Sequence, residues 1–94
     1  MKSIWRKVVV ALAFAVLVGG CATTNALQNA QSALDKAKVS GAPEKAKLDY
    51  YMAQTYLEAA KKEVDEGDND EARTFAAESE KYSGQAIQKA GGAK

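Results

Sequence analysis

Cys21 carries the most nucleophilic side chain in the sequence, and no base is available to activate it. It is the only cysteine among 94 residues, and the chain has no histidine. No serine is followed by a lysine at the Ser-x-x-Lys spacing, so the usual nucleophile–base pairs of enzymes are missing. Carboxylates are numerous, but an open helical surface neither excludes water nor tunes a pKa for acid–base catalysis. We therefore expect a protein that is not an enzyme and that binds no cofactor.

The densest group of acidic side chains is the run of residues 65–71, Asp-Glu-Gly-Asp-Asn-Asp-Glu. A calcium-binding loop that began at Asp68 would have Ala72 where an oxygen ligand is needed and Arg73 where the glycine belongs. We interpret the run instead as a solvated turn whose carboxylates stabilise the N-terminus of the following helix. No metal site is predicted there.

Charge is distributed unevenly along the chain. The formal net charge is +1, yet three of the 13 basic residues lie in the first seven positions, and all 12 acidic residues lie from Asp35 onward. The chain after residue 20 therefore has ten basic side chains against twelve acidic ones. This net negative charge argues against binding to nucleic acid.

The first twenty residues are predicted to be a secretory signal peptide. A basic start, MKSIWRK, is followed by an uncharged apolar run from Val8 to Val18 and then by two glycines. Signal peptides combine such a basic segment, an apolar core and small residues before the cleavage site. A membrane-spanning helix is the alternative, but this run would extend only about 16 Å as a helix, whereas a bilayer core is about 30 Å thick.

The residues that end this segment, Val18, Gly19, Gly20 and Cys21, resemble the lipobox of bacterial lipoproteins. The resemblance implies a diacylglyceryl group on the Cys21 sulfur, cleavage after Gly20, and acylation of the new α-amine by a fatty acid such as palmitate. Several acyl chains hold a protein on a membrane lipid layer far more firmly than one chain does. Ala22 follows the cysteine, and the sorting rule of enteric bacteria then implies the outer membrane, with the protein facing the periplasm.

Apolar residues recur at helical spacing through most of the chain after Cys21. The predicted organisation is a lipidated tether at 21–25, a helical domain at 26–90 and a flexible tail at 91–94. Within the domain we expect a first helix near 26–39, which Ser40-Gly41-Ala42-Pro43 ends. Glu66-Gly67-Asp68 then separates the second helix from the third, because glycine suits a left-handed helix cap and aspartate an N-cap.

Each predicted helix carries a stripe of apolar and small side chains that we expect to be buried. The stripes are Ala26, Ala30, Ala33 and Ala37; Ala46, Tyr50, Ala53, Leu57, Ala60 and Val64; and Ala72, Ala76, Ser79, Ser83, Ala86 and Ala90. The second helix has another apolar face, formed by Leu48, Met52, Thr55 and Ala59, with Tyr51 and Tyr56 beside it. A helix that is apolar on two faces requires two neighbours, so we place it in the middle of the bundle. The helical spacing of the tyrosines favours packing over a glycan-stacking surface.

These elements predict an all-α fold, a small antiparallel three-helix bundle made of a long helical hairpin and one shorter N-terminal helix. Alanine side chains let helices approach closely but bury little apolar area. We therefore expect marginal stability of the isolated monomer, and either self-association or a helical envelope protein as partner.

Residues 42–68, APEKAKLDYYMAQTYLEAAKKEVDEGD, resemble short bacterial outer-membrane lipoproteins that carry a helical domain of unknown function. Such domains have Ala-Pro-Glu before a long helix and Glu-Gly-Asp after it, and in some relatives they precede an OmpA-like domain that binds the cell wall. No segment of this sequence resembles that second domain, so wall binding by that route is not implied. The resemblance implies a membrane-anchored, non-catalytic module with an interaction or structural role.

Lys94 supports an alternative function. Small alanine-rich outer-membrane lipoproteins of the Braun type are joined to peptidoglycan through the side chain of a C-terminal lysine, and Lys94 follows Gly-Gly-Ala in this sequence. The similarity implies a covalent link between the outer membrane and peptidoglycan through Lys94. The Braun type is one continuous helix, whereas this chain is predicted to bend twice. A third interpretation is an accessory subunit of a larger envelope complex.

Overall fold

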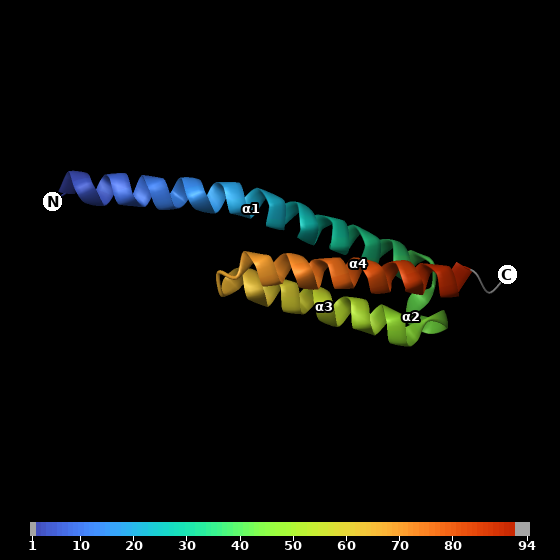
Figure 1. Cartoon of the computed structure of the whole chain (residues 1–94). Coiled ribbons are helices and arrows are strands. Elements are labelled where there is room, and N and C mark those ends of the chain that lie inside the picture. Colours follow the sequence, from blue (N-terminus) through green and yellow to red (C-terminus); the bar gives the residue numbers. More distant parts are fainter. Residues whose placement is uncertain (1, 92–94) are drawn as a thin grey trace.

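The computed structural model describes the backbone of residues 2–91 and the side chains of residues 21–91. The elements of this part are all helices, in the order α1 (Lys2–Val39), α2 (Ala42–Lys45), α3 (Lys47–Asp65) and α4 (Asn69–Gly91). The three long helices lie side by side in an elongated molecule of 67 × 16 × 15 Å (Figure 1). The predicted all-α three-helix bundle is therefore confirmed.

The central helix of the bundle is α4, and the prediction that the second long helix occupies this place was wrong. α4 packs extensively along both α3 and α1, whereas α1 and α3 share a smaller contact. α3 runs antiparallel to the other two helices, and α1 and α4 run in the same direction (Figure 1). All six residues of the α4 stripe, from Ala72 to Ala90, are buried. These small side chains allow α4 to approach a neighbour on each side.

α1 begins at Lys2, and the predicted boundary at Ala26 does not exist in the structure. Residues 21–25, expected to be a non-helical tether, continue the helix. Thr23 is buried, so tertiary packing overrides the weak helix propensity of this segment. α1 has 38 residues and α3 has 19, because α1 also includes the residues predicted to be a signal peptide.

The first part of α1 extends past the turn that joins α3 to α4 (Figure 1). Within the part of the chain that the structure describes, no helix combines the length and the apolar composition needed to cross a membrane.

The connection from α1 to α3 contains a break that the sequence pattern did not predict. Gly41 has a φ of 86° and ends α1, and Pro43 lies in the first turn of α2, both as predicted. α2 then stops after one turn, because Ala46 leaves the helical conformation with φ −139° and ψ 53°. The next helix, α3, starts directly afterwards.

The turn between α3 and α4 has the predicted cap structure. Gly67 has a φ of 82°, its amide bonds to the Val64 carbonyl at 3.0 Å, and the Asp68 amide bonds to the Glu63 carbonyl at 2.8 Å. This pair of bonds is a Schellman motif, which satisfies the last carbonyl groups of α3. The Asp68 carboxylate then accepts the Glu71 amide at 3.0 Å and caps α4.

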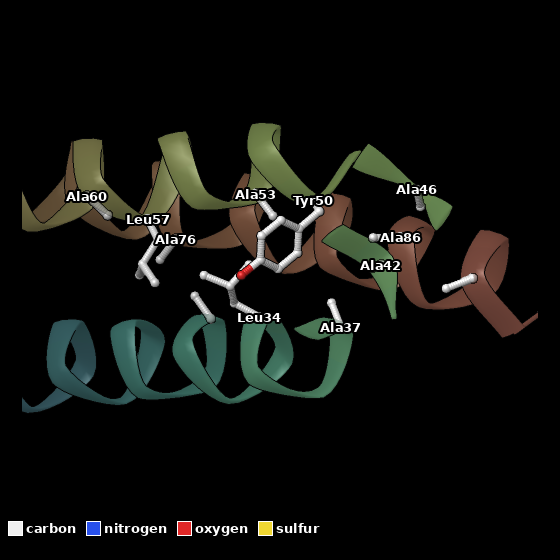
Figure 2. Close-up of a cluster of buried hydrophobic side chains, with 12 residues drawn as sticks. Leu34, Ala37, Ala42, Ala46, Tyr50, Ala53, Leu57, Ala60, Ala76 and Ala86 are labelled. Carbon is white, nitrogen blue, oxygen red and sulfur yellow. The ribbon is translucent and has the colours of Figure 1, made fainter. Parts of the chain in front are cut away.

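The core consists mostly of alanine, with a few large side chains between the helices. Leu34 of α1 and Tyr50 and Leu57 of α3 are the largest of its buried members. Figure 2 shows the Tyr50 ring in the space between α3 and α1, with its hydroxyl group directed toward Leu34. The predicted stripes are buried except for Ala26, Ala33 and Val64, which are half-buried. At the far end α4 includes Gly91, and the remainder of the predicted tail lies outside the described residues.

Candidate functional site

Cys21 lies on α1 with its side chain exposed and its thiol free. The backbone of the three preceding lipobox residues, Val18, Gly19 and Gly20, belongs to the same helix. Two residues after the cysteine, the Thr23 side chain is buried against the bundle.

The position of Cys21 along the bundle follows from one contact between α1 and α3. Lys61 Nζ lies 3.5 Å from Gln31 Oε1, so these two residues lie at a similar level. Cys21 precedes Gln31 by ten residues on α1, and Gly67 follows Lys61 by six, so both lie toward the same end of the bundle. The C-terminal end of α4 lies at the opposite end of the bundle (Figure 1).

The acidic turn beside this end uses its carboxylates in local structure. Asp68 caps α4, and Asp70 forms an ion pair with Arg73 three residues later. Desolvation, followed by the charges of Glu66 and Asp68, raises the pKa of Glu63 above its ordinary value. Among the described residues, no three His, Cys, Asp or Glu side chains are grouped closely enough to hold a metal ion.

Except for Tyr51, which is 50% exposed, the described aromatic side chains lie in or beside the contacts between helices. The Tyr56 ring of α3 stacks on the Tyr82 ring of α4 with centroids 5.6 Å apart, and its other neighbour is Phe75 at 5.9 Å. Tyr50 is buried, and its ring meets that of Tyr51 edge to face at 5.4 Å. Two of these three ring pairs, Tyr56–Tyr82 and Tyr56–Phe75, therefore join α3 to α4.

Two polar contacts in the core were missed by the sequence analysis. The Lys89 ammonium of α4 lies 2.5 Å from the Asp49 carboxylate of α3, whose side chain is only 8% exposed. The Ser79 hydroxyl donates to the Ala53 carbonyl at 2.7 Å. The sequence did contain a signal for the burial of Asp49, because Asp49 precedes Ala53 by four residues and so lies on the side of the apolar stripe. Both contacts join α4 to α3.

Lys94 lies outside the described residues, so its surroundings are not part of the structure. The other predicted site residues, Val18, Gly19, Gly20 and Cys21, follow one another on α1. Cys21 lies at one end of the bundle, and the polar core contacts belong to the α3–α4 interface.

Comparison with known proteins gives one result. No match was found among curated proteins or among solved structures. Residues 25–94 match the family described as "Domain of unknown function (DUF4398)". The match starts four residues after Cys21 and includes α2, α3, α4 and the bundle-forming part of α1. The chain therefore belongs to this family of unknown function, whose domain here is the helical bundle.

Proposed function

We propose that the protein is a non-catalytic bacterial lipoprotein. Acyl chains on Cys21 anchor it to the outer membrane, and the helical bundle is presented to the periplasm as an interaction or structural module. The observation that carries this proposal is the exposed Cys21 side chain at one end of the bundle, directly after a lipobox-like sequence. An exposed thiol at an end can be acylated without disturbing the packed helices.

The family boundary supports the same division of the chain. The match starts at residue 25, so the lipobox-like residues lie outside the domain. The described core cluster and the side chains packed against it lie between Ala26 and Ala90. Cleavage after Gly20 would therefore remove none of these core residues.

A non-catalytic role agrees with how the polar side chains of the bundle are used. Asp68 caps a helix, Asp49 pairs with Lys89, and Ser79 joins two helices. These groups stabilise the fold, and the sequence has neither a histidine nor a Ser-x-x-Lys spacing to supply the base for a nucleophile. This use of the polar groups supports a bundle that binds a partner protein or has a structural role.

Detergent partitioning of envelope fractions tests the anchor. The full-length chain, Cys21→Ser and the matched control Thr24→Ser are expressed in an enteric bacterium, and membranes are washed with salt and alkaline carbonate. The parent and Thr24→Ser are expected in the detergent phase of a Triton X-114 separation, and Cys21→Ser in the aqueous phase. If Cys21→Ser partitions like the parent, the anchor is not on this cysteine and the proposal is wrong.

The choice of membrane is tested separately with Ala22→Asp. In the same host, the sorting rule for residues after the lipid-bearing cysteine predicts that this variant stays in the inner membrane. Density-gradient separation of the two membranes measures the distribution. An unchanged outer-membrane fraction would remove the support that Ala22 gives to that location.

A further inference from the structure

The second apolar face of α3 is left without a partner by the observed packing. It consists of Leu48, Tyr51, Met52, Thr55 and Ala59, and we call it the outer α3 face. Leu48 is 75% exposed and Tyr51 is 50% exposed, although both are large hydrophobic side chains. Because α4 occupies the centre of the bundle, α3 has a close neighbour on one side and this face remains open.

The outer α3 face has the properties of a helix–helix contact surface. Its residues recur at intervals of three and four, so they form one continuous strip about 16 Å long. Thr55 lies in the middle of this strip, and its hydroxyl group already donates a hydrogen bond to the Tyr51 carbonyl at 2.8 Å. Burying Thr55 against a partner would therefore leave its hydroxyl donor satisfied. The Tyr51 ring is held in place by its edge-to-face contact with Tyr50.

The sizes of the side chains on this face are self-complementary. If two copies of α3 pack antiparallel about a point between Ala53 and Gln54, Leu48 of each copy faces Ala59 of the other. In the same register Met52 faces Thr55. A parallel, in-register pair would instead place Leu48 against Leu48 and leave a gap at Ala59. Large side chains opposite small ones give the closer packing.

The charges along α3 favour the same direction. Two exposed lysines, Lys45 and Lys47, against one exposed carboxylate, Glu44, give its beginning a net positive charge, because the Asp49 carboxylate is already paired with Lys89. Its last two turns and the following turn have four carboxylates against two lysines: Glu63, Asp65, Glu66 and Asp68 against Lys61 and Lys62. An antiparallel pair brings each basic beginning near an acidic end, whereas a parallel pair brings like charges together.

We infer that two copies of this chain pair through their outer α3 faces, with the two α3 helices antiparallel. The pairing does not depend on the lipid. Where Cys21 carries the proposed acyl chains, the pair has an anchor near each end and lies along the membrane surface.

Disulfide formation between two differently tagged full-length forms tests the direction of pairing. One form carries Leu48→Cys and the other Ala59→Cys, and they are produced together and oxidised in isolated envelopes. The antiparallel pair predicts the mixed dimer as the main product, whereas predominant Leu48→Cys homodimers would overturn the antiparallel arrangement. The parent chain, whose only cysteine is Cys21, gives the background. A disulfide in the parent reports a free Cys21 and so counts against the lipid anchor, not against the pairing.

Sedimentation equilibrium of the purified full-length chain in detergent tests the face itself. Leu48→Glu is expected to raise the dissociation constant of the dimer about tenfold or more, because it places a charge in an apolar contact. Val39→Glu is the matched control, since Val39 is 86% exposed but lies on α1, and a change within about twofold is expected. A monomeric parent chain, or equal effects of the two substitutions at unchanged helix content, would overturn the inference.

Discussion

The hydroxyl group of Ser79 donates a hydrogen bond to the Ala53 carbonyl, 2.7 Å away, and so joins α4 to α3 inside the core. One turn later on α4, the equally buried hydroxyl of Ser83 has no hydrogen-bond partner among the described residues. Both serines belong to the same stripe of small side chains. They therefore form a matched pair for measuring what a buried hydroxyl contributes with and without a partner.

Ser79→Ala is expected to lower the free energy of unfolding by about 1 kcal/mol, because a buried hydrogen bond is lost. Ser83→Ala is expected to leave it unchanged or to raise it by up to about 1 kcal/mol, since a buried hydroxyl without a partner is removed. Urea unfolding followed by circular dichroism measures both values. Equal losses in the two variants would show that the hydrogen bond to Ala53 contributes nothing.

Substitutions of Asp49 and Lys89 are expected to have strongly non-additive effects on the free energy of unfolding, because the two side chains form an ion pair. Lys89→Ala leaves the buried Asp49 carboxylate without its cation and is expected to cost about 1–3 kcal/mol. The value is below that of a fully buried pair because the Lys89 side chain is 62% exposed. Adding Asp49→Asn to Lys89→Ala is expected to restore part of the loss, since no buried charge remains. A double-mutant cycle with a coupling energy near zero would contradict this account.

Two glycines in different backbone conformations should respond oppositely to alanine. Gly67 has a φ of 82°, and a Cβ there would meet nothing within 4 Å. An alanine at this position would therefore destabilise the fold only through its strained backbone conformation. Gly67→Ala is expected to lower stability by about 1 kcal/mol. Gly84 lies on the exposed side of α4 with equally open space, and Gly84→Ala is expected to raise stability by up to about 1 kcal/mol. Thermal unfolding measures the change in Tm of each variant. Changes of the same sign in both variants would contradict the assignment of Gly67 as the helix cap.

Replacing Glu63 with glutamine is expected to stabilise the fold by an amount that depends on pH. Desolvation and the charges of Glu66, Asp68 and Glu71 raise its pKa in the folded chain. An acid whose pKa is higher in the folded state than in the unfolded state destabilises the fold as the pH rises through that range and the group ionises. Glu63→Gln is therefore expected to raise the Tm near neutral pH, and the gain is expected to shrink as the pH falls and Glu63 becomes protonated. A gain that stayed constant toward acidic pH would contradict this origin.

Much of the fold was predictable because burial follows the helical period. Every residue of the stripe from Ala72 to Ala90 is buried, and the turn at Gly67 has the cap that Glu-Gly-Asp indicated. The order of the helices across the bundle was not predictable in the same way. Two apolar faces on α3 suggested a central position, but close approach on two sides depends on side-chain volume, and the small residues of α4 supply it.

Contacts between distant residues could not be predicted from one sequence. Asp49 and Lys89 are forty positions apart, and they meet only because of how far α4 slides along α3. The start of α1 was also missed, because local propensity near Thr23 is weak and packing against the bundle decides the conformation. Cys21 is different, since its proposed chemistry rests on a short sequence pattern, and the fold contributes its exposure and its place at one end.

The intact mass of the chain released from envelopes tests the central claim most directly. Envelopes are boiled in detergent with and without prior muramidase digestion, and the released protein is weighed by mass spectrometry. The account predicts a chain that begins at Cys21, carries several acyl chains and is released without muramidase. Release only after digestion, with a muropeptide remnant on Lys94, would favour the alternative link to peptidoglycan. A chain without acyl groups in either sample would contradict the lipoprotein account.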